Sequence, residues 1–249
     1  MHSLDDLQAS WKALRGNGEV RVREIACVGA PRTILCAEMG SHTAPEIALA
    51  AGVHGDEPAG PGALLALVRE GELDPSFAYR MWPCTNPSGY SAGARTSIDG
   101  NDINRSFGRG GQTPEARAII TANRDRKFEL SLDLHEDYEA EGFYCYEYGL
   151  GGVGRAVVEA VRERGYPIQD ISRCDLGAPF EEPELEDGVV RPTRTLEDGI
   201  GGLSYTMSIV RRAAKRALTF ETPTRLPFEE RIAIHRIAVK AAIGALSKP

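Results

Sequence analysis

Apolar and polar residues alternate along the chain with two periods. The first residues repeat apolar side chains at helical spacing from Leu4 to Leu14, after Ser3 in the N-cap position. Later apolar runs are short and bounded by turn residues, as in β-strands. The expected helices are 3–15, 61–70, 114–127, 153–164, 204–214 and 227–246, and the expected strands are 20–28, 33–37, 47–53, 79–83, 130–134, 142–148 and 217–222.

Helices separate most of these strands, and no internal repeat is visible. This order predicts an α/β fold, a three-layer α/β/α sandwich on a central mixed, mostly parallel twisted sheet. Two stretches lack apolar periodicity. Residues 85–111 are rich in Asn, Asp, Arg and Gly, which favours a functional segment, and residues 175–202 are rich in Pro, Gly and acid. The second stretch is expected to be a long surface loop or a lid.

Composition narrows the function classes. At 249 residues, with 42% hydrophobic and 26% charged residues, the chain is expected to be a single domain over 1–249. The net charge of −7 and the lack of a basic stripe argue against nucleic-acid binding. The densest basic run, residues 211–216, is explained more simply as a solvated helix face.

The compartment is expected to be the cytoplasm. The first residues show no basic and apolar segments of a secretory signal, and no apolar run is long enough to cross a membrane. The five cysteines are odd in number and share no C-x-x-C spacing, which is typical of reduced core thiols. An oligomer is possible but nothing indicates one.

Candidate chemistry lies at the ends of two predicted strands. The run 47–53 is followed by His54 and, three residues later, Glu57, and the run LSLDL is followed by His135. Open α/β sheets place ligand crevices at the carboxyl ends of their strands. Two histidines and one carboxylate with an open position form a recognised catalytic zinc set. The alternative for the first pair is an ordinary polar surface turn.

Several motifs, in order along the chain, resemble the zinc metallocarboxypeptidase family, including its succinylglutamate desuccinylase and aspartoacylase branch. They are HGDEPAG, NPSGYSAGAR with DGNDINRSF, DLH and LTFETP, between about residues 50 and 225. The resemblance implies a carboxypeptidase-like fold and one Zn²⁺ ion held by His54, Glu57 and His135. It also implies that Glu221 acts as general base, against the alternative of an exposed strand-end carboxylate.

The resemblance gives roles to five further residues. Arg95 would stabilise the developing oxyanion, and Asn104 with Arg105 would clamp the substrate's carboxylate. Asp102 would orient His54, or alternatively cap a turn. Tyr205 is the candidate for the family's substrate-contacting tyrosine, with a core tyrosine as the competing interpretation.

The resemblance leaves the substrate open between a small peptide and an N-acyl amino acid. Only 28 residues follow Glu221, without the β-rich extension typical of the deacylases, which favours a compact carboxypeptidase. Murein peptide amidases of the family are a further alternative by analogy. The non-enzyme alternative is a carboxylate-binding module with an inactive site.

Overall fold

The computed structural model describes residues 3–14, 20–108, 110–171, 184–192 and 202–247. Nine strands in this part of the chain form one sheet in the order β1-β2-β4-β3-β5-β9-β6-β8-β7. Their bounds are β1 Val20–Ile25, β2 Ile34–Met39, β3 Glu46–Ala51, β4 Ala78–Trp82, β5 Leu130–Asp137, β6 Tyr144–Gly149, β7 Glu184–Glu186, β8 Val189–Arg191 and β9 Arg216–Pro223. The centre, β4-β3-β5-β9, is parallel, and antiparallel pairs flank it on both sides.

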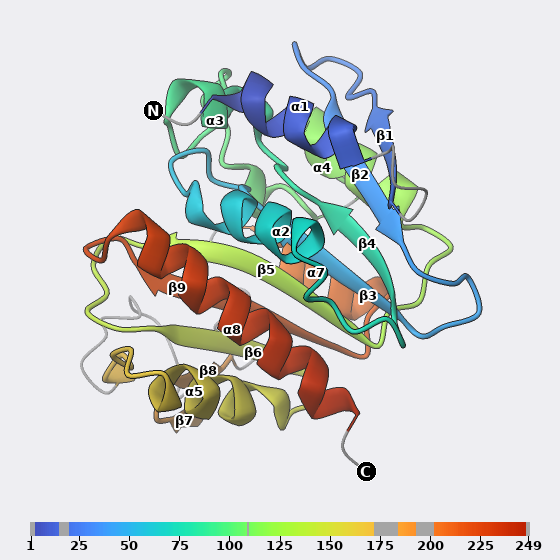
Figure 1. Ribbon diagram of the computed structural model, residues 1–249. Coiled ribbons are helices and arrows are strands. Elements are labelled where there is room, and N and C mark those ends of the chain that lie inside the picture. Colours follow the sequence, from blue (N-terminus) through green and yellow to red (C-terminus); the bar gives the residue numbers. More distant parts are fainter. Residues whose placement is uncertain (1–2, 15–19, 109, 172–183, 193–201, 248–249) are drawn as a thin grey trace.

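Helices cover both faces of this sheet (Figure 1). The described helices are α1 Leu4–Ala13, α2 Ala59–Arg69, α3 Pro87–Ala92, α4 Pro114–Ala122, α5 Val153–Glu163, α7 Tyr205–Arg212, α8 Phe228–Leu246 and the short 3₁₀ helix η2 Ile103–Arg105. One apolar core joins the sheet to α1, α2, α5 and α8, and a second joins it to α4 and α7. The predicted three-layer α/β/α fold with a mixed, mostly parallel sheet is confirmed.

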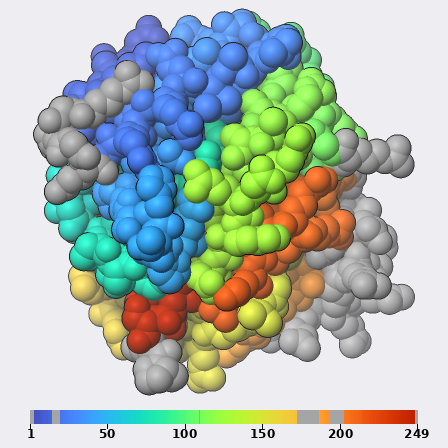
Figure 2. Space-filling model, turned by 90° about the vertical axis from the view of Figure 1, so that its right-hand side faces the viewer, coloured from blue at the N-terminus to red at the C-terminus, as the bar shows by residue number. Residues whose placement is uncertain are grey.

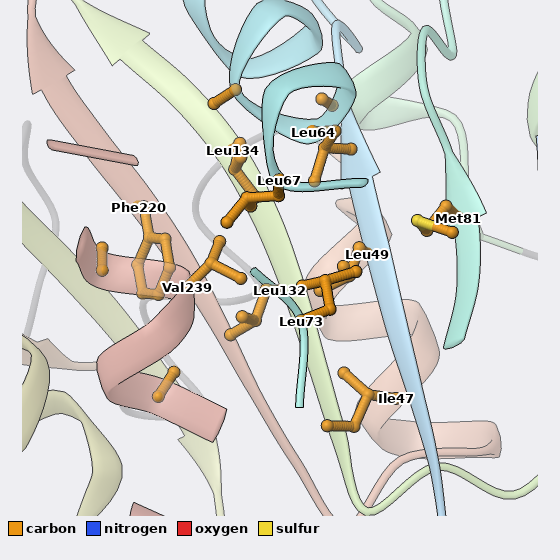
Figure 3. Close-up of a cluster of buried hydrophobic side chains, with 14 of the residues drawn as sticks. Ile47, Leu49, Leu64, Leu67, Leu73, Met81, Leu132, Leu134, Phe220 and Val239 are labelled. Atoms are coloured by element: carbon orange, nitrogen blue, oxygen red, sulfur yellow. The ribbon is translucent and has the colours of Figure 1, made fainter. Parts of the chain in front are cut away.

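The side chains of strand β5 point alternately to the two faces of the sheet. Leu130, Leu132 and Leu134 are fully buried in the core beneath α2 and α8, which Figure 3 shows for the last two. Successive side chains of a strand point to opposite faces, so Asp133 and His135 face the layer that contains α7. The polar side chains of Asp133 and His135 therefore lie on the α7 side of the sheet.

Several expected elements differ from the structure. The segment 85–111 is not wholly irregular, because it contains α3, capped by Asn86, and the 3₁₀ turn η2. Helix α4 ends before Asn123 rather than at 127, because Phe128 must reach the sheet to pair with Ala214. Strand β5 does not stop at 134 but continues through His135.

The stretch 175–202 was expected to be a loop or a lid throughout. Within it the structure describes residues 184–192, which form the antiparallel β7–β8 hairpin at the sheet edge. Strand β8 joins the sheet beside β6, with Val189 and Val190 fully buried. The remainder of the expected lid lies outside the described residues.

Two further expectations concern compartment and thiols. No helix among the described residues is long and apolar enough to span a membrane. Cys27, Cys36, Cys84 and Cys145 are free and buried, whereas Cys174 lies outside the described residues. Burial raises the pKa of the Cys27 thiol to about 11, so that thiol stays protonated at neutral pH.

Candidate functional site

The turn after β3 carries His54 and Glu57 and is fixed by close backbone packing. A side chain on Gly55 would place its Cβ atom 2.0 Å from the carbonyl carbon of Gly89 in α3. The Gly55 amide also donates to the carbonyl of Ala94 at 3.0 Å. Glycine is therefore required here by space, and the contact holds the two functional side chains at the end of the sheet.

Three buried side chains converge at this point. Glu57 lies between two imidazole rings, with Oε1 2.5 Å from Nδ1 of His54 and Oε2 3.0 Å from Nδ1 of His135. The two rings meet edge to face at 4.9 Å between centroids. One ligand atom from each of the three residues lies within 4.8 Å of the others. His54 and Glu57 thus form one potential metal site with His135, which lies 78 positions after Glu57 in the chain.

The second nitrogen of each imidazole faces an aspartate. His135 Nε2 lies 3.0 Å from Oδ2 of Asp133, and His54 Nε2 lies 3.5 Å from Oδ1 of Asp102. A carboxylate on the far nitrogen favours the tautomer whose Nδ1 lone pair points into the site. Asp102 makes no side-chain capping bond to η2, so its geometry favours the orienting role over the capping one.

Sequence reasoning missed Asp133. It lies two residues before His135 on the same strand, so the period of two places both side chains on one face. Asp133 is almost completely buried, at 1% exposed. The signal was therefore present in the DLH motif, but it was assigned to the histidine alone.

The charges of this cluster fit a divalent cation. Burial by itself raises the pKa of Glu57, but His135 and His54 outweigh it and lower that pKa to about 2. Burial would lower the pKa of His135, but Asp133 and Glu57 raise it well above its usual value. Both oxygens of the Glu57 carboxylate face an imidazole Nδ1, at 2.5 Å for Oε1 and 3.0 Å for Oε2. Two imidazole nitrogens and an ionised carboxylate are a zinc-type donor set.

Glu221 lies beside this cluster through strand pairing. In the parallel register of β5 and β9, His135 is the partner of Glu221. Glu221 is half-buried within β9 rather than at its end. Burial is the main cause that raises the pKa of Glu221, the charges of Glu57 and Asp137 add to it, and His135 opposes them, so that the pKa lies at about 8. A carboxyl group with a raised pKa next to a metal site can accept and return a proton.

The segment before α4 places three polar side chains around the same cavity. Arg95 Nη1 lies 3.3 Å from His54 Nδ1, and its Nη2 lies 3.3 Å from Asp102 Oδ2. Asn104 is buried, and its Oδ1 accepts a hydrogen bond from the backbone of Tyr205 at 3.1 Å. Arg105 and Arg95 both line the cavity, which measures about 190 Å³. Both arginines that line the cavity therefore come from this one segment.

The placement of Tyr205 does not match the expected substrate contact. Its ring is 2% exposed in the core beneath α7, packed edge to face on Phe107, and its hydroxyl lies 3.5 Å from Ser131 Oγ. Ser204 and Met207 of the same segment line the cavity instead. This placement favours the competing interpretation, a core tyrosine, because the helical rotation of α7 directs residue 205 away from the cavity.

A different tyrosine borders the cavity. Tyr138 follows β5, is 79% exposed and lines the opening. The inner wall is formed by Tyr144, Tyr146 and Tyr148, alternate residues of β6 on one face. Tyr144 is the antiparallel partner of Glu221, so the wall begins next to the candidate base.

Part of this chain is similar to a known family of catalytic domains. Residues 43–148 match the succinylglutamate desuccinylase/aspartoacylase catalytic domain. A search of curated proteins finds no match.

Solved structures extend the likeness to the whole fold. A presumed metallopeptidase from Shewanella amazonensis SB2B is 21% identical, with a TM-score of 0.71 over 97% of this chain and 91% of its own. A metallo-carboxypeptidase from Burkholderia cenocepacia is 17% identical, with a TM-score of 0.69 over 96% and 67%. Carboxypeptidase A from Helicoverpa armigera is 16% identical, with a TM-score of 0.70 over 98% and 73%. At these identities the structural likeness shows the fold alone.

Proposed function

Because the chain fits the zinc carboxypeptidase-like family near its desuccinylase branch, we propose that it is a zinc-dependent hydrolase of an amide bond next to a free carboxylate. Small peptides that lose their C-terminal residue are the proposed substrates. The observation that carries this proposal is the convergence of His54, Glu57 and His135 beside Glu221 in one cavity.

The metal would be held by His54 Nδ1, His135 Nδ1 and the Glu57 carboxylate. Zinc in such a site supplies Lewis acidity and lowers the pKa of water to about 7. Asp133 and Asp102 hold the two rings with the correct nitrogen directed inwards. Arg95, close to Glu57 and His54, limits the negative charge that the three acids concentrate there.

Glu221 is the proposed general base. Its carboxylate removes a proton from the attacking water and later returns that proton to the leaving nitrogen. The surroundings favour this exchange, because burial and neighbouring carboxylates raise the pKa of Glu221 towards neutrality. Among the described carboxyl groups that line the cavity, only Glu221 lies opposite His135 on a neighbouring, paired strand.

The two arginines have separate proposed roles. Arg95, next to the metal ligands, places positive charge where the carbonyl oxygen becomes negative in the transition state. Arg105 offers a planar guanidinium to the substrate's carboxylate, with Asn104 fixed beside it by its bond from Tyr205. Because these groups and Glu221 line one cavity, a substrate carboxylate held by Arg105 would lie in the same cavity as the amide bond that is cleaved.

A second candidate function is deacylation of an N-acyl amino acid. It is favoured by the match of residues 43–148 to the desuccinylase/aspartoacylase catalytic domain. Both reactions break an amide next to a carboxylate and use the same residues. They differ in the group that occupies the far side of the cavity, the peptide chain or the acyl group.

The proposal is tested with a panel of dipeptides, tripeptides, murein peptides and N-acyl amino acids. Native protein, chelator-treated protein and the Glu221→Gln variant are compared, with zinc content from elemental analysis. We expect release of C-terminal residues by native protein only, with recovery after zinc is returned to the chelated sample. Release of acyl groups without C-terminal residues would establish the second candidate. Equal behaviour of all three samples would show that any activity does not come from this site. Binding of these compounds without turnover would favour a non-catalytic carboxylate-binding module.

A further inference from the structure

A second cavity lies on the opposite side of α7 from the catalytic one. Its lining comes from α4 and the turn after it, from residues around Phe107, and from α7. In Figure 2 the green segment around α4 and the orange segment around α7 lie next to each other on one face of the molecule. The cavity measures about 390 Å³, twice the catalytic cavity.

Helix α7 separates the two cavities. Ser204 and Met207 face the catalytic side, whereas Tyr205, Ser208 and Ile209 face the second side. The two sets follow the helical period of 3.6 residues, so they occupy different faces of one helix. The second cavity is therefore distinct from the substrate site, although the two share a wall.

The second cavity combines apolar walls with two cations. Its apolar surface comes from Phe107, Ile119, Ile120 and Ile209. The only charged residues in its lining are arginines, Arg124 and Arg212, and no acid is among the described lining residues. Neither Arg124 nor Arg212 forms an ion pair with an acidic side chain of the described residues.

A buried polar atom adds to this pattern. Asn123 is 7% exposed and lines the same cavity. Its side-chain oxygen has no hydrogen-bond partner among the described residues. Buried amide groups are nearly always paired, by protein, water or ligand, so this one marks a place where a polar group is missing.

We propose that the cavity between α4 and α7 binds a small amphipathic anion. Arg124 and Arg212 would hold its carboxylate or phosphate, and the isoleucines and Phe107 would cover its apolar part. Guanidinium groups pair with such oxyanions through two parallel hydrogen bonds. Ligand sites of this kind are mostly apolar, with a few polar groups that fix orientation.

A simpler role for the arginines is stabilisation of helix ends, since basic groups favour helix C-termini. Arg211 and Arg212 both lie in the last turn of α7. Only Arg212 belongs to the cavity lining, so Arg211→Gln changes the same charge at the same helix end without altering the cavity. This variant separates the two explanations.

The experiment is calorimetric titration with octanoate as the probe and octylammonium as the cation of equal chain length. Native protein and Arg211→Gln are expected to bind octanoate alike and to ignore octylammonium. The double variant Arg124→Gln/Arg212→Gln is expected to bind octanoate at least about tenfold more weakly, because charge-assisted bonds are lost. Both substituted arginines are exposed, so unfolding curves are expected to stay unchanged. Octyl phosphate as a second probe distinguishes a phosphate from a carboxylate preference.

Two further variants make the proposal falsifiable. Arg105→Gln removes one of the two arginines that line the catalytic cavity and is expected to leave octanoate binding intact. Loss of binding in this variant, with binding retained in the double variant, overturns the proposal. Ile120→Trp fills the apolar part without a charge change and is expected to weaken binding. Unchanged affinity in both Ile120→Trp and the double variant, or no heat at millimolar octanoate, also overturns it. Binding is measured without turnover, so this outcome is independent of the hydrolase proposal.

Discussion

Replacement of Asp133 by asparagine tests whether the buried histidines are built to hold a metal ion. Asp133 Oδ2 lies 3.0 Å from Nε2 of His135, and the other carboxylate oxygen has no hydrogen-bond partner within the described residues. Asparagine has nearly the same volume, so Asp133→Asn removes a charge with little change in packing. The amide can still accept the N–H bond of His135 but makes the ring a weaker ligand.

The expected effect is on metal affinity more than on folding. Loss of such an outer carboxylate typically costs about 10- to 100-fold in affinity, which is about 1.4 to 2.7 kcal/mol. The upper half of this range is expected for Asp133, because it is 1% exposed and its distance to the ring is short. Asp102→Asn should cost less, because that carboxylate lies 3.5 Å from His54 and is partly exposed. Zinc affinity is measured by competition with a chromophoric chelator.

Asp137→Asn is the matched control. Asp137 lies on the same strand, two residues after His135, and accepts a hydrogen bond from the hydroxyl of Tyr144 at 2.7 Å. The control removes an equal charge near the site without touching either imidazole. Zinc affinity of Asp133→Asn within twofold of the native value, with Asp137→Asn as tight, would refute the orienting role of Asp133.

Three other changes have expected outcomes. Tyr138→Ala should lower kcat/KM roughly tenfold with an unchanged unfolding curve, since the ring borders the cavity at 79% exposure. Gly55→Ala should destabilise by about 3 kcal/mol or more in urea unfolding, whereas Gly108→Ala, whose nearest contact is 3.7 Å, should not. Burial lowers the pKa of His235 from 6.5 to about 3. Between pH 6.5 and pH 3 this imidazole is therefore protonated in the unfolded chain but neutral in the folded one, so the free energy of unfolding decreases as the pH falls below 6.5. Between pH 7 and pH 5 the native protein should lose about 2 kcal/mol more unfolding free energy than His235→Gln.

The fold could be predicted from sequence where periodicity is local and long. Strand β3, which precedes His54, and the helices α2, α5 and α8 follow directly from their apolar spacing. Helix α3 was missed because six residues with little apolar content give no period. Its stability comes from Asn86, which caps it, and from the contact of Gly89 with Gly55, a tertiary contact that no local pattern reveals.

The site residues divide in the same way. His54 and His135 could be placed together because strand ends of parallel neighbours meet at one edge of the sheet. The position of Tyr205 could not be predicted, because the resemblance gave only its order along the chain. Which residues of α7 reach the cavity depends on the rotation of that helix about its axis. Tyr138 had no motif around it, and only its exposure at the opening marks it.

The register of three strands connects the candidate metal ligand His135, the proposed base Glu221 and the tyrosine wall of the cavity. His135 on β5 pairs with Glu221 on β9, and Glu221 pairs in turn with Tyr144 on β6. The match to the desuccinylase/aspartoacylase domain ends at residue 148, well before Glu221. The general-base proposal therefore depends on the pairing of β9 with β5, not on that match. A register shift of one residue would turn Glu221 to the opposite face, so the same pairing that buries Phe220 beneath α8 fixes the carboxylate at the cavity.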